Sequence, residues 1–166
     1  MATIGPASSS KEILFKMVEK GADVVRLNFS WGSYAEKSAQ IETVREAEAV
    51  HNRKIPIMID LPGPRVQEGK DHSYSKDVIS ALTDKDIEHI QFGVKHRVDW
   101  IALSFVGSAD DVQNCREAIK KYGGNQKVVA KVERAVAVER LDEIVAAADG
   151  VMVARHEPML DSTTDA

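Results

Sequence analysis

Short apolar runs alternate with longer amphipathic stretches along most of this chain. Runs rich in β-branched residues predict five strands, at residues 24–29, 55–61, 100–105, 127–133 and 150–154. A further short strand is predicted at Thr3–Ile4, where Gly5 and Pro6 end it. The stretches between the strands predict helices at residues 9–20, 34–51, 84–96, 109–122 and 137–147. This alternation predicts an α/β protein with parallel strands and right-handed crossovers.

Polar residues and glycines mark several ends of the predicted helices. Ser9 followed by Glu12, and Thr83 followed by Asp86, have the spacing of capping boxes. Gly21 and the pair at 123–124 fit helix C-termini, because glycine adopts the left-handed conformation at little cost.

The length of the chain limits the architecture. A parallel barrel and an open doubly wound sheet both fit the pattern, but a complete (β/α)8 barrel takes about 250 residues. With 166 residues, this chain has room for only about six strand–helix units. Residues 62–82 interrupt the alternation with a polar stretch that has no clear periodicity, and an exposed loop or the scar of a deletion is expected there. No glycine-rich phosphate loop follows a strand, so dinucleotide binding has no support.

The composition of the chain argues against several classes of partner and indicates a cellular compartment. The formal net charge is −4 and no run of Lys or Arg occurs, so nucleic acid is not an expected partner. No apolar run approaches the length of a membrane span, and no signal peptide is visible at the N-terminus. The single cysteine, Cys115, excludes an intrachain disulfide and a thiolate zinc site. We therefore expect a cytoplasmic protein with no membrane partner.

Polar residues stand where several predicted strands end, although strands covered by helices should be apolar there. Ligands of parallel α/β proteins bind at the carboxyl ends of the strands. The set comprises Arg26, Asn28, Ser30, Asp60, Ser104, Lys131 and Glu133, followed beyond the last strand by Arg155 and Glu157.

Cations and carboxylates at one end of a sheet suit an anionic substrate held together with a divalent metal. Each residue alone also has a structural interpretation. Arg26 and Lys131 fit strand-end salt bridges, Asp60 fits a turn, and Ser104 fits a buried hydroxyl. It is the convergence of the whole set that favours a functional site.

Six segments, in order, resemble pyruvate kinase, and together they cover residues 3–155. The segments are Thr3-Ile4-Gly5-Pro6-Ala7-Ser8, Arg26-Leu27-Asn28-Phe29-Ser30, Asp60 with Gly63-Pro64, Ala102-Leu103-Ser104-Phe105, Ala130-Lys131-Val132-Glu133, and residues 148–155 with the text ADGVMVAR. The resemblance implies a parallel (β/α)8 barrel of the TIM type, here incomplete. It also implies the glycolytic reaction that converts phosphoenolpyruvate and ADP to pyruvate and ATP, with Mg²⁺ (or Mn²⁺) and K⁺ as cofactors.

The resemblance also implies residue roles. Arg26 would contact the transferring phosphoryl group, and Lys131 would stabilise charge on that group and on the developing enolate. Glu133 would bind magnesium. Potassium would be held by Asn28, Ser30 and Asp60, and Ser104 would lie in the same substrate pocket without an assigned essential role.

Several positions depart from the family pattern. Leu61 replaces a threonine whose carbonyl helps to hold potassium, and Trp31 replaces a histidine common beside the nucleotide. Gln67 stands where an arginine is usual, and residues 66–82 leave no room for the lid domain that the family inserts there. After Arg155 the family continues Gly-Asp-Leu-Gly, whereas this chain has His-Glu-Pro, so Glu157 is the candidate second magnesium ligand.

These departures shape the expected function. Residues 1–166 are expected to form a single partial barrel domain without the family's lid and C-terminal domains, with weak or no turnover. Two alternatives remain: a metal-dependent lyase acting on pyruvate or oxaloacetate, and a non-catalytic module derived from pyruvate kinase that assembles with another copy. Open sheet edges favour a homo-oligomer in each case.

Overall fold

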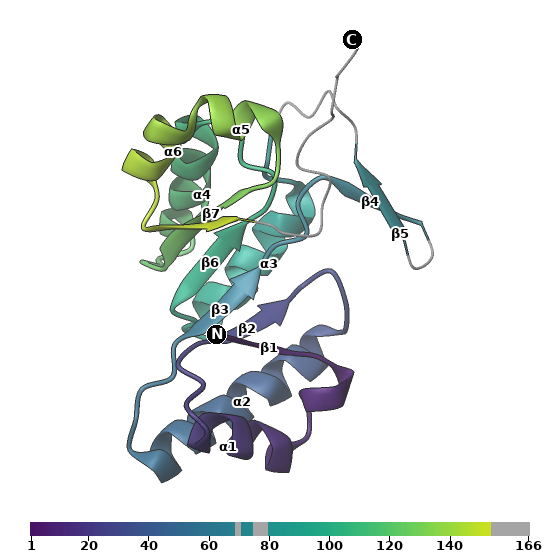
Figure 1. The fold of residues 1–166 in the computed structure, drawn as a ribbon, viewed down its shortest axis with the longest axis vertical. Helices are drawn as coiled ribbons and strands as arrows, with labels where there is room; N and C mark the ends of the chain where they lie inside the picture. The colour runs from purple at the N-terminus through teal and green to yellow at the C-terminus, as the bar shows by residue number, and fades with distance from the viewer. Residues whose placement is uncertain (69–70, 75–79, 154–166) are drawn as a thin grey trace.

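Six parallel strands form the core of the protein in a computed structural model that describes residues 1–68, 71–74 and 80–153 (Figure 1). The order in the sheet is β1-β2-β3-β6-β7-β8, so neighbours in sequence are neighbours in space. Their bounds are Ala2–Ile4, Val25–Asn28, Ile57–Asp60, Trp100–Leu103, Lys127–Val132 and Gly150–Val153. The sheet curls into an incomplete (β/α) barrel, which confirms the predicted α/β class and the parallel strand order.

The two faces of the curled sheet have different roles. The outer face carries alternate aliphatic residues such as Leu27, Ile59 and Leu103, which are fully buried in the main hydrophobic core. The inner face holds a smaller apolar cluster of Met58, Ala102 and Val129. Because side chains alternate along a strand, the polar residues at the strand ends share the inner face with this second cluster.

The helices begin and end largely where local signals predict them. Their bounds are Lys11–Glu19 (α1), Tyr34–His51 (α2), Asp84–Lys95 (α3), Ala109–Lys121 (α4), Ala135–Glu139 (α5) and Leu141–Ala147 (α6), with a 3₁₀ turn at Pro6–Ser8 (η1). Thr83 and Asp86 form the predicted capping box of α3. The prediction for α1 was wrong: Ser10 is the N-cap and accepts from the Ile13 N–H, whereas the Ser9 hydroxyl donates to the Pro6 carbonyl.

The last predicted helix is divided in two at Arg140. The N–H of Arg140 donates to the carbonyls of Val136 and Val138, which ends α5. Its carbonyl accepts from the Ile144 N–H, which begins α6. Arg140, with φ −110°, is therefore both the C-cap of α5 and the N-cap of α6. The apolar pattern alone does not reveal that the helix is divided there.

The predicted loop at residues 66–82 contains an antiparallel hairpin. Strands β4 (Arg65–Glu68) and β5 (Asp71–Tyr74) pair with each other and form a separate two-stranded sheet. The loop prediction was wrong for these residues because Val66 is their only aliphatic residue, so no apolar alternation marks the strands. Within the described residues, no helix has the length and apolar character that crossing a bilayer requires.

Candidate functional site

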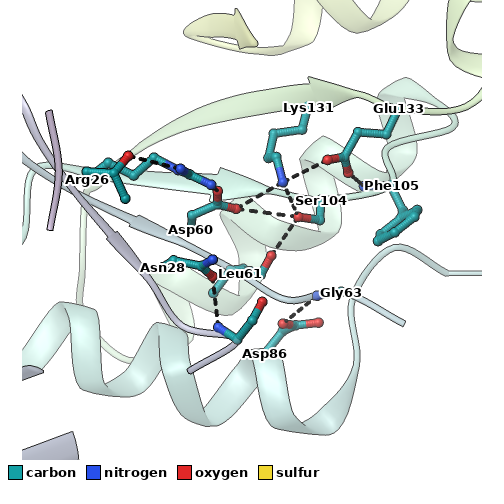
Figure 2. Close-up of polar contacts among 12 residues, drawn as sticks. Arg26, Asn28, Asp60, Leu61, Gly63, Asp86, Ser104, Phe105, Lys131 and Glu133 are labelled. Atoms are coloured by element: carbon teal, nitrogen blue, oxygen red, sulfur yellow. Dashed lines mark hydrogen bonds and ion pairs between the residues drawn. The ribbon is translucent and has the colours of Figure 1, made fainter. Parts of the chain in front are cut away.

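Four charged side chains meet on the inner face of the sheet at the carboxyl ends of its strands (Figure 2). Arg26 comes from β2, Asp60 from β3, Lys131 from β7, and Glu133 directly follows β7. The strand register places Asp60 beside Asn28 on one side and beside Ala102 on the other. The parallel topology thus brings together residues that lie more than 100 positions apart.

Asp60 lies at the centre of this cluster and is 2% exposed. One of its carboxylate oxygens accepts from both Nε and Nη2 of Arg26, with Nε at 2.7 Å. Its other oxygen lies 3.2 Å from the Lys131 ammonium. Both oxygens of this buried carboxylate therefore face cations, as burial of a charge requires.

The Lys131 ammonium has two further partners. It donates to the Ser104 hydroxyl at 2.8 Å and forms an ion pair with Glu133 Oε1, also at 2.8 Å. The Ser104 hydroxyl in turn donates to the Leu61 carbonyl at 2.6 Å. Glu133 uses its other oxygen to accept the Phe105 N–H at 2.9 Å, so each group of the cluster is held in place.

The four formal charges of the cluster cancel, with two cations and two carboxylates in contact. Such a network is stable without a ligand but presents two adjacent cations to an incoming anion. A phosphate or carboxylate group can take over the hydrogen bonds of Arg26 and Lys131, which then leaves the oxygens of Asp60 and Glu133 free for metal cations. This exchange of partners is the chemistry that the arrangement allows.

The predicted potassium ligands are only partly brought together. Asn28 and Asp60 are register neighbours, but the side-chain oxygen Oδ1 of Asn28 accepts the Ser30 N–H at 2.9 Å. Asp60 instead contacts Arg26 and Lys131. Asn28 and Asp60 therefore lie side by side, but their side-chain oxygens are engaged by the Ser30 N–H, Arg26 and Lys131.

The predicted magnesium ligands differ in what the structure describes. Glu133 is in the cluster, whereas Glu157 lies outside the described residues, as does Arg155. Within residues 1–68, 71–74 and 80–153, no three His, Cys, Asp or Glu residues group into a metal site. A single carboxylate fits magnesium, which binds through one or two carboxylates and completes its shell with water and substrate oxygens.

The structure adds supporting residues that the sequence analysis missed. Thr3 on β1 accepts from Arg26 Nη1 at 3.0 Å, and the two residues are register partners. The buried Asp86 carboxylate, at the start of α3, accepts the Gly63 N–H at 3.2 Å and fixes the loop after β3. Burial raises the pKa of Asp86 above its usual range. The capping spacing of Asp86 is visible in the sequence, but its contact with Gly63 requires the fold.

A depression of about 820 Å³ lies beside the cluster, between the end of β1 and the start of α2. Its walls include Thr3, Pro6, Asn28 and Trp31, whose indole is 52% exposed. The exposure shows that Trp31 is not a core residue. The depression shares Thr3 with the partners of Arg26, so it lies next to the charged cluster.

Comparison with known proteins gives a consistent result. The family described as "Pyruvate kinase, barrel domain" matches residues 1–79 and 75–158. Curated pyruvate kinases are similar to this chain: that of Thermococcus litoralis is 31% identical, that of Mycobacterium intracellulare 29% and that of Thermotoga maritima 26%. Each alignment covers 95% of this chain and 50–51% of the relative, so the chain spans about half the length of these relatives.

Each of these alignments runs over 237 residues, which is longer than the 166-residue chain. The relatives therefore contain residues within the aligned region that have no counterpart here. The fold, the strand-end residues and these matches agree, and the chain belongs to the pyruvate kinase family through its barrel domain.

Proposed function

We propose that the cluster at the strand ends binds phosphoenolpyruvate or pyruvate and retains the arrangement for phosphoryl transfer between phosphoenolpyruvate and ADP. The observation that carries this proposal is the buried contact of Arg26, Asp60, Lys131 and Glu133 at one site. Membership of the family supports the same assignment. Cytoplasmic glycolysis would be the setting of this reaction.

The proposed roles follow from charge. Arg26 and Lys131 would turn from Asp60 to the substrate, with Arg26 on the phosphoryl oxygens and Lys131 between the phosphoryl group and the enolate oxygen. Phosphoryl transfer depends mainly on positioning and on neutralising charge, which two fixed cations provide. Ser104 would keep Lys131 oriented, since its hydroxyl is anchored on the Leu61 carbonyl.

Metal ions would occupy the carboxylates that this movement leaves free. Glu133 would hold Mg²⁺ or Mn²⁺, and Asn28, Ser30 and Asp60 would hold K⁺. A bound divalent ion would neutralise charge on the phosphoryl group and on the substrate carboxylate. The contribution of this chain is to fix the ligands, because the buried Phe105 N–H holds one oxygen of Glu133 in place.

ADP is assigned to the depression beside Trp31, and here we expect the chain to be weak. The relatives contain residues within the aligned region that this chain lacks, and we attribute to these residues the closure over the nucleotide. Each lost transition-state contact costs about 10²- to 10³-fold in rate. We therefore expect binding of substrate analogues without detectable ATP formation.

The test combines ligand binding with turnover. Binding of oxalate, which resembles the enolate of pyruvate, is measured by calorimetry with and without Mn²⁺. A coupled assay follows ATP formation from phosphoenolpyruvate and ADP. Lys131→Met should abolish Mn²⁺-dependent oxalate binding, and Arg26→Met should do so as well. The Arg26 side chain is 24% exposed, so this second variant disturbs the fold less.

Lys127→Met is the matched control, because Lys127 lies on the same strand at its opposite, exposed end. It should bind oxalate as the parent does. Equal binding in the Lys131, Arg26 and Lys127 variants would refute the assigned site. Oxaloacetate decarboxylation without ADP would instead support the lyase alternative. ATP formation within about tenfold of an ordinary kinase turnover would show that the lid is dispensable.

A second candidate function, assembly, is supported by the edges of the sheet. In the described part of the chain, β1 and β8 each pair on one side only. Val151 and Val153 on β8 are 38% and 58% exposed, and Val138 and Val145 on α5 and α6 are also exposed. Unpaired strand edges and exposed aliphatic residues promote association. We propose that two or more copies associate through this edge, which light scattering of the purified protein would reveal.

A further inference from the structure

Lys37 is a buried cation without an ion-pair partner among the described residues. It lies in the second turn of α2, and the residue is only 6% exposed. Its ammonium lies 5.8 Å from the centre of the Phe29 ring. The adjacent Glu36 carboxylate attracts the Lys37 ammonium electrostatically but is not ion-paired with it, and it accepts from the N–H and the hydroxyl of Ser33. Burial lowers the pKa of Lys37 from its ordinary value.

An unpaired buried cation is uncommon, since burying a charge without a partner is costly. Lys37 also lies close to a positive helix N-terminus, which adds to the unfavourable potential. Gly32, with φ +82°, lies beside Lys37: a Cβ there would be 3.6 Å from the ammonium, an ordinary contact distance, and 3.1 Å from a carboxylate oxygen of Glu36.

Lys37 lines a second depression, of about 520 Å³, between the starts of α2 and α3. Its walls contain three cations, Lys37, Arg65 and Lys85, and no carboxylate. Lys85 lies over the Tyr34 ring at 5.4 Å and pairs with Glu88 outside the depression. The other polar residues of the wall are Ser30, Ser33, Tyr34 and His89.

We propose that this depression is a phosphate-binding site, with Lys37 and Lys85 as its principal ligands. Lys37 has no ion-pair partner among the described residues, and charge-assisted hydrogen bonds to a phosphate would compensate its buried ammonium. Arg26, Asp60, Lys131 and Glu133 do not line the depression, so it is distinct from the cluster at the strand ends. The depression shares Gly32 and Lys37 with the depression to which ADP is assigned, and Ser30 with the proposed K⁺ ligands. The inference requires neither turnover nor oxalate binding at the strand-end cluster.

Two sources of the phosphate group are possible, inorganic phosphate and a small phosphate monoester. Titration of the ¹⁵N-labelled full chain with inorganic phosphate, and separately with glycerol phosphate, distinguishes them. Sodium chloride keeps the ionic strength constant. We expect saturable amide shifts at residues 30–37 and 85–89 with at least one of the two probes. The probe that binds more tightly shows whether the site takes inorganic phosphate or a phosphate monoester.

The variants test the assigned ligands. Lys37→Met should weaken binding at this depression about tenfold or more, and Lys85→Met, at a residue with a 58% exposed side chain, about threefold. Lys120→Met removes an exposed cation on α4 and should change affinity less than about twofold. Lys37→Met should also melt at a higher temperature than the parent, because it removes a buried charge.

Two results would overturn the proposal. The first is unchanged phosphate affinity in Lys37→Met. The second is a response confined to residues near Ser104 and Lys131 that Lys131→Met abolishes, because the phosphate would then bind only at the strand-end cluster. A failure of oxalate to bind at that cluster would leave this site unaffected.

Discussion

Replacing Lys131 by methionine should be among the most destabilising single changes in this protein. Lys131 is 6% exposed and connects Asp60, Ser104 and Glu133 by contacts of 2.8–3.2 Å. Methionine keeps most of the aliphatic stem but removes the ammonium. Asp60 retains Arg26, whereas Glu133 keeps the hydrogen bond from the Phe105 N–H but loses the cation that pairs with it among the described residues.

The expected cost follows from that uncompensated charge. Breaking a buried ion pair by removing one partner costs about 3–5 kcal/mol. A typical domain has a free energy of unfolding of about 5–15 kcal/mol, so this change removes a large part of the margin. Replacing the Glu133 carboxylate by a neutral amide as well should restore much of the lost stability. In Lys131→Met/Glu133→Gln the amide oxygen still accepts the Phe105 N–H, and the expected cost falls to about 1–2 kcal/mol.

Urea denaturation followed by circular dichroism measures both variants. With a slope of about 2 kcal/mol per M, the midpoint of Lys131→Met should fall by about 2 M, and that of the double variant by less than about 1 M. Lys127→Met, on the same strand, should shift the midpoint little. A Lys131→Met midpoint within about 0.5 M of the parent, or additive effects in the double variant, would refute the view that this cluster is a buried and coupled network.

Three further predictions concern other parts of the molecule. Burial lowers the pKa of His89 to about 4, so that between pH 6.5 and 4 the unfolded chain binds a proton that the folded chain does not. The free energy of unfolding should therefore fall by up to about 3 kcal/mol as the pH drops from 6.5 to 4, and His89→Gln should reduce this pH dependence in urea titrations. Gly63→Ala should lower the free energy of unfolding by about 2 kcal/mol or more, because φ is +68° and the new Cβ would lie 2.8 Å from the Phe105 ring. The control Gly21→Ala, with φ +93° and no atom within 4 Å of the new Cβ, should lower it by only about 1 kcal/mol, and thermal melts compare the two variants. Val153→Lys should shift the protein toward monomers in sedimentation experiments if copies associate through the exposed edge of β8, and an unchanged distribution would argue against that edge.

The sequence by itself determined the fold class. The apolar alternation marked the strands in their correct order, because strands buried on both faces have a pattern that local composition reveals. The positions of Arg26, Asp60, Lys131 and Glu133 at the ends of predicted strands indicated that these side chains converge. The Thr83 cap of α3 was also readable, since a cap depends on residues three positions apart.

Features that depend on backbone geometry or distant contacts required the tertiary structure. The hairpin of β4 and β5 is held by pairing between its own strands rather than by an apolar pattern, and Arg140 divides α5 from α6 through hydrogen bonds of its backbone. The positive φ of Phe105 could not be predicted either. Glycine is the residue that usually marks this conformation in a sequence, and here a phenylalanine adopts it.

The tertiary structure also decided how the candidate sites are connected. The strand-end positions predicted that Lys131 would lie near Asp60, but not that its ammonium would be shared among Asp60, Ser104 and Glu133. Nor did the amphipathic pattern of α2 show that Lys37 would be buried without a carboxylate partner. Burial and pairing of a charge depend on which distant elements pack against it, and only the assembled sheet and helices bring those elements together.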